Sequence, residues 1–247
     1  MVACVGRADW RRGLVLNGTS EYADFGTFNA LDSLTEFSVS IWCDISGAIN
    51  RKILCQRSYG STGWFIGTPN EGGVVYAGYG NGAAYPVIAN VSITTGWHLL
   101  TLVYTDSFGL SLYIDGVYRA NIQSGTISFN NDKLQIGRQD YAATAYWDSG
   151  VCAPLIWNRG LSPAEVLGLY NETTAVTNEG ASVEVPRAWV NGTNSLLLDL
   201  DIPETWDTGD TVTNGTLMVN NGSASGTATI TGTPDVSSAV QVPSPHR

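Results

Sequence analysis

Residues 36–45 read EFSVSIWCDI, and this stretch decides the fold class. Apolar side chains occupy every second position from Phe37 to Ile45, and mostly polar side chains occupy the positions between them. Because successive side chains of a β-strand point to opposite faces, the alternation predicts a strand with one buried face. Trp42 falls on the other face, so we expect it to line the concave face of a sheet.

Similar short segments, separated by turn residues, recur from residue 13 to residue 160. Asp115-Gly116 lies between two of them and predicts a tight hairpin, because both residue types tolerate the positive φ that such a turn needs. The composition, with 28 glycines and only 14% charged residues, also favours short strands joined by turns. The sequence therefore predicts an all-β protein.

One helix is predicted after these strands. Ser162-Pro163-Ala164-Glu165 supplies a capping serine, a proline at the first helical position and a glutamate three residues after the serine. The apolar residues Val166, Leu169 and Tyr170 follow, which predicts about two helical turns ending near Asn171.

The composition changes after residue 172. Residues 173–247 contain only two of the 25 aromatic residues, and they carry eight acidic residues against two basic ones. We predict a β-sandwich domain over residues 1–172. Residues 173–247 are predicted to form an acidic, β-rich C-terminal extension that serves docking or assembly.

The formal net charge of −10 and the pI near 4.5 limit the classes of partner. Proteins that bind nucleic acid or anionic membranes usually carry a basic surface, so neither partner is expected. No apolar run is long enough to span a bilayer. The first twelve residues contain no apolar stretch of signal-peptide length, so we expect no export signal in the chain as given.

Two cysteines raise the question of a disulfide. Cys43 and Cys55 would face each other if residues 38–45 and 53–57 formed a hairpin. They would then form either a cross-strand disulfide or two buried thiols, and the spacing leaves both open. No Cys-x-x-Cys pair occurs, which argues against structural zinc.

Four segments carry a resemblance to a known family: 14–26 (LVLNGTSEYADFG), 37–42 (FSVSIW), 97–116 (with WHLLTLVY and LYIDG) and 156–166 (IWNRGLSPAEV). In this order they resemble the strands and the helix of concanavalin A-like, laminin G-like domains, to which pentraxins are related. The resemblance covers residues 13–171 and implies a two-sheet antiparallel jelly-roll sandwich with one short helix. Related domains bind glycans, act as adhesion modules or are glycosidases, so the fold alone does not fix the function.

A catalytic strand is the first functional candidate. Glucanases of this family carry Glu-x-Asp-x-x-Glu, and the nearest match here is Asp199-Leu200-Asp201-Ile202-Pro203-Glu204. Its first carboxylate is one methylene shorter, Pro203 disturbs the strand, and the segment lies outside the region of resemblance. We therefore expect no catalytic residues and no enzymatic activity.

A calcium site is the second candidate. Gly137-Arg138-Gln139-Asp140 resembles a pentraxin segment that supplies oxygen ligands to calcium. The partnering acidic loop has no clear counterpart, because Arg57-Ser58-Tyr59 stands near its expected place. The resemblance implies either no cofactor or one weakly held calcium ion at Asp140.

Aromatic residues beside Gly-rich loops are the third candidate, because sugars stack on aromatic faces and bond to nearby amides. The predicted ligand-binding residues are Trp64, Tyr79, Tyr85 and Trp147, with amide groups from Asn81 and Gln139. Further ring candidates are Tyr76, Tyr141 and Tyr146. The alternative interpretation is that these rings fill the sandwich.

These observations favour a non-enzymatic module displayed at a virion surface or outside the cell. A virion protein that decorates a phage capsid or mediates adhesion would be made in a reducing cytosol and needs no export signal. Its extension at residues 173–247 would contact a capsid or other subunits, glycans are the expected ligands, and a homo-oligomer is left open. A secreted or cell-surface lectin module is the first alternative, and a glycoside hydrolase of this fold is the second.

Overall fold

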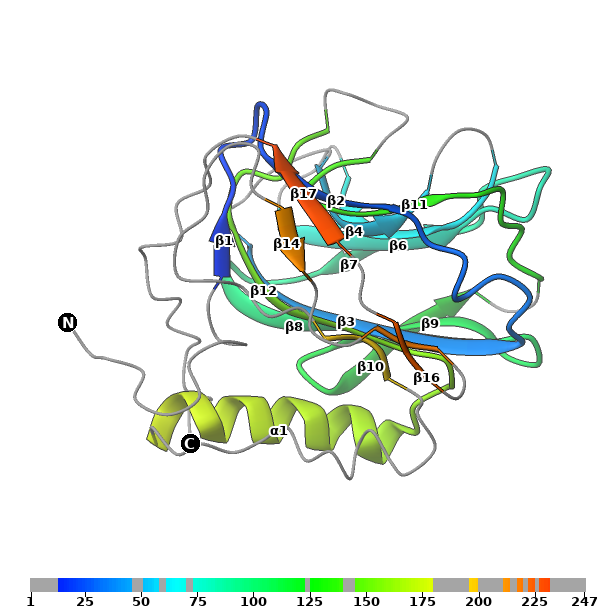
Figure 1. The fold of residues 1–247 in the computed structure, drawn as a ribbon. Coiled ribbons are helices and arrows are strands. Elements are labelled where there is room, and N and C mark those ends of the chain that lie inside the picture. Colours follow the sequence, from blue (N-terminus) through cyan, green and yellow to red (C-terminus); the bar gives the residue numbers. More distant parts are fainter. Residues whose placement is uncertain are drawn as a thin grey trace.

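A computed structural model gives the structure of this chain (Figure 1). It describes residues 13–45, 51–57, 61–69, 73–122, 125–139 and 145–179, and five short strands that lie between residues 196 and 231.

The described strands form two antiparallel sheets that stack face to face as a jelly-roll sandwich (Figure 1). The first sheet has the order β1-β12-β3-β8-β9-β10, with β13 also paired to β12: β1 (Gly13–Val15), β12 (Gly150–Trp157), β3 (Glu36–Ile45), β8 (Gly96–Thr105), β9 (Gly109–Ile114), β10 (Val117–Ile122) and β13 (Leu196–Asp199). The second sheet has the order β14-β17-β2-β11-β4-β5-β6-β7: β14 (Thr211–Thr213), β17 (Thr227–Thr231), β2 (Tyr22–Thr27), β11 (Lys133–Ile136), β4 (Arg51–Gln56), β5 (Trp64–Thr68), β6 (Val74–Tyr79) and β7 (Val87–Ser92). The strands β15 (Leu217–Val219) and β16 (Gly222–Ala224) form a separate pair. The predicted all-β fold class is confirmed.

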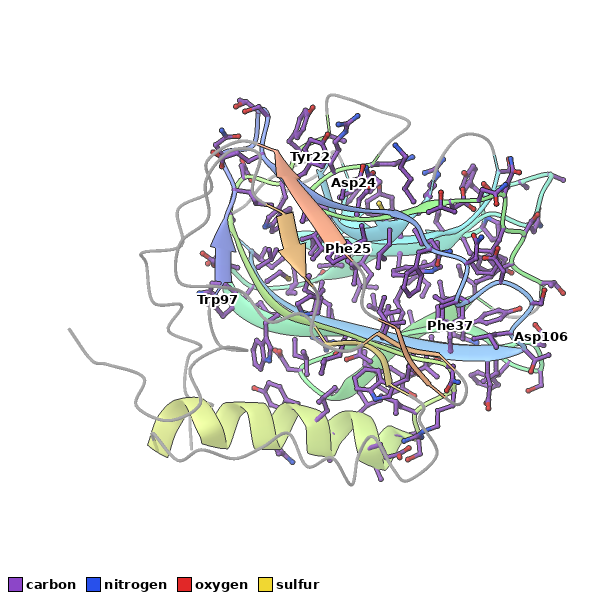
Figure 2. The ribbon with its side chains drawn as sticks, viewed as in Figure 1. Tyr22, Asp24, Phe25, Phe37, Trp97 and Asp106 are labelled. Atoms are coloured by element: carbon purple, nitrogen blue, oxygen red, sulfur yellow. The ribbon has the colours of Figure 1, made fainter. Side chains whose placement is uncertain are left out.

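The core lies between the two sheets, where each sheet presents the apolar side of its alternating strands. Phe37 of β3 and Tyr104 of β8 lie 5.3 Å apart, and Phe37 lies 5.9 Å from Trp64 of the second sheet. Figure 2 shows Phe37 between the two sheets. Burial of large rings contributes about 2–3 kcal/mol per side chain, so this aromatic group holds the two sheets together.

The predicted hairpin is confirmed at the end of β9. Ile114 pairs with Val117, which leaves Asp115 and Gly116 as a two-residue turn with φ of +54° and +76°. Both values lie in the left-handed region that this turn type requires. Asp115 also accepts hydrogen bonds from Leu99 N and from His98 Nδ1, which fixes the turn against β8.

The helix α1 (Pro163–Glu179) covers the outer face of the first sheet (Figure 1). Its predicted start is confirmed, because Ser162 N donates to Glu165 Oε2 and Glu165 N donates to Ser162 Oγ. The helix has 17 residues, so the prediction of two turns is wrong. Residues 171–179 contain no glycine or proline, so the sequence has no helix breaker at Asn171 and the helix continues to Glu179.

Trp42 does not line an open concave face as predicted. Its ring stacks on Tyr170 of α1, with centroids 5.8 Å apart, and both belong to a second apolar cluster between the first sheet and the helix. The alternation placed Trp42 correctly on the outer side of β3. It could not show that a helix from later in the chain covers that side.

The hairpin that would have placed Cys43 opposite Cys55 does not form. Cys43 lies on β3 of the first sheet and Cys55 lies on β4 of the second sheet, and both are buried thiols. Cys43 Sγ contacts His98 O at 3.8 Å, and Cys55 Sγ contacts Arg138 O at 3.0 Å. Of the two alternatives left open by the sequence, the structure has thiols.

The C-terminal region contributes strands to both sheets. β13 pairs with β12, and β17 pairs with β2 and with β14. These described strands therefore extend the sandwich of their own chain. Within the described strand order, β14 is an edge strand of the second sheet.

Candidate functional site: a cation–aromatic face

The outer face of the second sheet is made by the alternate residues of strands whose other side chains enter the core. Leu54 and Ile66 are paired residues in the core, so the neighbouring pair, Cys55 and Phe65, points outward. The same rule places Lys52 and Tyr76 on the outer side, opposite Gly67. This face carries cationic side chains in contact with aromatic rings.

Arg57 is the centre of the first group of contacts. β4 ends at Gln56, and Arg57 N donates to Lys133 O at 3.1 Å, which fixes the backbone. The guanidinium stacks 3.8 Å from the ring centroid of Tyr85, and its Nε donates to the Tyr85 hydroxyl at 2.6 Å. Its Nη1 donates to the amide oxygen of Gln139 at 3.3 Å.

Lys52 lies beside this group and is only 4% exposed. Its Nζ is 4.6 Å from the ring centroid of Tyr76 and 5.1 Å from that of Phe65, and it donates a hydrogen bond to the Tyr76 hydroxyl. Burial lowers the pKa of Lys52 from 10.5 to about 8. Burial also raises the pKa of Tyr76, so this hydroxyl keeps its proton at neutral pH.

Arg138 forms a second cation–aromatic group. Its guanidinium carbon lies 4.4 Å from the ring centroid of Tyr22 and 5.6 Å from that of Tyr146. Tyr22 precedes the core residue Ala23 on β2 and so points outward, and Figure 2 shows it at the upper sheet. Gly137, with φ of +80°, turns the chain before Arg138, and a Cβ there would lie 2.2 Å from Leu16 Cδ1.

We call this surface the cation–aromatic face. It consists of Tyr22, Lys52, Arg57, Phe65, Tyr76, Tyr85, Arg138, Gln139 and Tyr146. Chemically, the face offers hydrogen-bond donors that carry charge, an amide and several aromatic rings. This combination can bind a polar ligand that also has an apolar side.

The structure brings together two of the six predicted ligand-binding residues, Tyr85 and Gln139, through their shared contact with Arg57. The further candidates Tyr76 and Tyr146 also lie on the cation–aromatic face. Asn81 lies elsewhere, in a turn, where its side-chain oxygen accepts from the backbone N–H groups of Ala83 and Ala84. Its amide therefore has a local structural role.

The other three predicted residues, Trp64, Tyr79 and Trp147, belong to the core and are 0% exposed. Trp64 Nε1 donates to Gln56 Oε1, and Trp147 Nε1 donates to Gly150 O. The three rings offer no face to a ligand at the surface. The alternative interpretation, that these rings fill the sandwich, describes them correctly, and they are not part of the candidate site.

Several sequence predictions fall outside the described residues. Asp140, Tyr141 and residues 200–204 are among them, so the calcium prediction and the carboxylate strand stay predictions. Within the part of the chain that is described, no group of three His, Cys, Asp or Glu side chains comes together.

The sequence reasoning missed Lys52, Arg57 and Arg138 as site residues. In the sequence, basic residues indicate nucleic-acid binding, and the net charge of −10 argues against that function. The charge therefore gives no reason to single out individual Lys or Arg residues as ligand-binding residues. A partial signal is present, because Cys55 and Arg57 alternate with the inward-facing Leu54 and Gln56, but the irregularity at Ile53, which is also in the core, hides the position of Lys52. The rings that stack on these cations come from other segments, and only the fold brings them together.

The first sheet has a hollow of about 400 Å³ on its outer side, near the start of α1. It is lined by Val103, Thr105, Phe108, Gly109, Ser111, Tyr113, Tyr118 and Pro163. Phe108 and Tyr118 are exposed, but these lining residues include no charge and no amide. The hollow therefore offers ring faces with fewer hydrogen-bonding groups than the cation–aromatic face.

Comparison with protein families identifies the fold family. Residues 17–167 match the family model of the concanavalin A-like lectin/glucanases superfamily. The chain belongs to this superfamily. The resemblance predicted from the four sequence segments is thus confirmed, and the members include both lectins and glucanases, so the match does not choose between binding and catalysis. No curated protein matches the chain significantly.

Solved structures agree with the lectin-like sandwich. A heptameric SAP-like pentraxin from Limulus polyphemus is similar with a TM-score of 0.51 and 16% identity, over 66% of this chain and 83% of the pentraxin. Domain 4 of an extracellular GH43 arabinanase from Geobacillus stearothermophilus, solved with arabinotriose, has a TM-score of 0.47 and 19% sequence identity. The match covers 62% of this chain and 73% of the arabinanase domain chain. The binding domain of botulinum neurotoxin serotype C1 has a TM-score of 0.45 and 17% sequence identity. The match covers 57% of this chain and 37% of the neurotoxin chain. At 16% identity the similarity to the pentraxin supports the fold alone, and the weaker similarity of the other two structures supports no conclusion about this chain.

Among the described residues, no helix has the length and apolar character needed to cross a bilayer.

Proposed function

We propose that this chain is a non-enzymatic recognition module that binds glycans through the cation–aromatic face. The observation that carries the proposal is the contact of Arg57 with Tyr85 and Gln139, on the sheet face that α1 does not cover. Tyr85 and Arg57 are partly exposed, so the ring can contact a sugar and the guanidinium can bond to its hydroxyl groups, while the buried Gln139 orients the guanidinium. The superfamily supports carbohydrate as the ligand class.

A glycan array tests the proposal, with Tyr85→Ala as the site variant. Tyr118→Ala is the matched control, because Tyr118 is an exposed tyrosine of the first sheet, 47% exposed, that lines the hollow described above. We expect binding by the wild type and by Tyr118→Ala, and at least a tenfold loss in Tyr85→Ala. Loss in Tyr118→Ala alone would move the site to the hollow, and an array without any signal would refute glycan binding.

The non-enzymatic part of the proposal has its own test. Incubation with mixed β-glucans should release no reducing sugar. Release that disappears in Asp201→Asn would show that the chain is a glycoside hydrolase, the alternative that superfamily membership also allows.

We propose further that the module is displayed on a virion, where residues 173–247 contact a capsid or other subunits. The buried thiols Cys43 and Cys55 suit a protein folded in a reducing compartment. The edge strand β14 could pair with a strand of another subunit. Density-gradient purification of virus particles, followed by detection of this chain with an antibody, tests the placement, and its absence from pure particles would favour the secreted lectin alternative.

A calcium ion at Asp140 remains part of this proposal as an untested site. A rise in the melting temperature with calcium that is abolished in Asp140→Asn would support it.

A further inference from the structure

The positive charges of this acidic protein are concentrated on one face. Of the six Lys and Arg side chains that the structure describes, four lie on the outer side of the second sheet: Lys52, Arg57, Lys133 and Arg138. Among the described acids, Asp24 accepts from Gln135 and lies 3.8 Å from Lys133, and the buried Asp132 acts electrostatically on Tyr85. A chain with a net charge of −10 thus directs most of its described cations toward the face proposed to bind glycans.

Three of these cations are held between pairs of aromatic rings. Arg57 lies over Tyr85 and Phe65, Arg138 over Tyr22 and Tyr146, and Lys52 over Tyr76 and Phe65. Stacking on a ring fixes the plane of a guanidinium while its N–H groups point outward from that plane. Cations held in this way are oriented before a ligand arrives, which lowers the entropy lost on binding.

An anionic group that is planar and small matches this arrangement. A carboxylate accepts two parallel hydrogen bonds from the edge of a guanidinium, and such charge-assisted pairs are about twice as strong as neutral hydrogen bonds. The rings beside each guanidinium suit the apolar face of a sugar. Extended polyanions are disfavoured, because the rest of the protein surface carries the opposite bias and would repel them.

We infer that the cation–aromatic face selects acidic sugars, in which a carboxylate of a uronic or sialic acid residue binds Arg57 or Arg138 while its ring contacts the adjacent tyrosines. This inference rests on the proposed glycan binding and adds the chemical class of the ligand. It also gives a reason for the contact of Tyr85 with a cation, Arg57. Lys52, buried behind these residues, adds positive potential without touching the ligand.

The test compares each acidic sugar with its neutral counterpart. The protein is titrated calorimetrically with digalacturonate and with the same disaccharide after reduction of its carboxyl groups, and with sialyllactose and lactose. We expect at least one acidic probe to bind tenfold or more tightly than its neutral partner. Raising the salt from about 50 mM to 500 mM should weaken that binding severalfold.

Two variants locate the carboxylate. Arg57→Met and Arg138→Met keep an apolar stem and remove the charge, and at least one of them should lose tenfold or more in affinity for the acidic probe. Arg119→Met is the matched control, because Arg119 is an exposed arginine on β10 of the first sheet, and it should bind like the wild type. Thermal melting shows which variants fold, and the two positions give independent readings if one variant does not.

The outcomes separate the inference from the proposed function. Equal binding of acidic and neutral probes would overturn the selection of acidic sugars and leave glycan binding intact. Tighter binding of dextran sulfate than of every carboxylated probe would overturn the assignment to carboxylates. Failure of all probes and of the glycan array would refute both proposals.

Discussion

Replacing Lys52 by methionine should remove a cost that the folded protein bears at neutral pH. The lysine is 4% exposed, and its ammonium lies against the rings of Phe65 and Tyr76. Desolvation is the main reason that its pKa falls from 10.5 to about 8. Methionine has a similar unbranched shape and fills much of the same space without a charge.

The magnitude follows from the pKa of the folded and unfolded states. Each pKa unit is worth about 1.4 kcal/mol, so the protonated lysine costs about 3 kcal/mol in the folded state. Between pH 8 and 10.5 the unfolded chain binds more protons than the folded one, so the free energy of unfolding rises with pH in this window. By pH 9.5 the wild type should recover about 2 kcal/mol relative to pH 7, whereas Lys52→Met should recover none of this.

Urea denaturation followed by tryptophan fluorescence at pH 7, 8, 9 and 9.5 measures this difference. The quantity to compare is the difference in unfolding free energy between the wild type and Lys52→Met. Both proteins share all other titratable groups, so the contributions of those groups cancel in this difference. Lys133→Met is the control, since Lys133 is the only other lysine and its side chain is 40% exposed. Its gap to the wild type should not change over this range.

A gap for Lys52→Met that stays constant from pH 7 to pH 9.5 would refute the reasoning. It would mean that the Tyr76 hydroxyl and the two rings offset the desolvation of the ammonium. The absolute gap at pH 7 is less diagnostic, because the lost cation–ring contacts oppose the relief of desolvation by about 1–2 kcal/mol.

Three other predictions concern the fold. Glu165→Ala should lower stability by about 1 kcal/mol at pH 7, because the carboxylate that accepts from Ser162 N and from Arg159 is lost. Arg159 lowers the pKa of Glu165 to about 2, so in thermal melts this difference should persist at pH 5 and shrink as the pH falls from about 4.5 to 2. Gly116→Ala should cost about 1–3 kcal/mol more than Gly26→Ala in urea denaturation, because both have φ near +70° but only a Cβ at Gly116 lies within 3.0 Å of Leu167. Iodoacetamide should label Cys43 and Cys55 only in denaturant, as peptide mass spectrometry would show, and rapid labelling of the native protein would contradict their burial.

The sequence was sufficient for the strands, the turn and the helix start because their signals are local, whereas the two-sheet jelly roll was implied by the family resemblance. The alternation in residues 36–45 needs only the two-residue period of a strand, and β3 has those bounds. The turn at Asp115-Gly116 and the capping serine Ser162 also act within a few residues. Each signal depends on backbone geometry that near neighbours decide.

The candidate site depended on distant contacts, and there the sequence was a poorer guide. Trp64 and Phe65 are adjacent in the chain, yet one enters the core and the other lies under Arg57. Period-two alternation separates the two faces of one strand, but it does not reveal which segment covers each face. For the same reason the sequence could not place Trp42 beneath α1, or Cys43 and Cys55 in different sheets.

The different coverage of the two outer faces explains why function is sought on the second sheet. On the first sheet, α1 buries Trp42, Trp157 and their neighbours in a second apolar cluster, so that part of the face serves stability. On the second sheet, the outward side chains include Lys52, Arg57 and Arg138 beside aromatic rings, in place of an apolar cluster under a helix. Burial of a cation such as Lys52 lowers the free energy of unfolding. If this face only had to be covered by another element, apolar residues in place of the cations would make the protein more stable. The proposed acidic ligand would give the cations between these aromatic rings a role beyond packing.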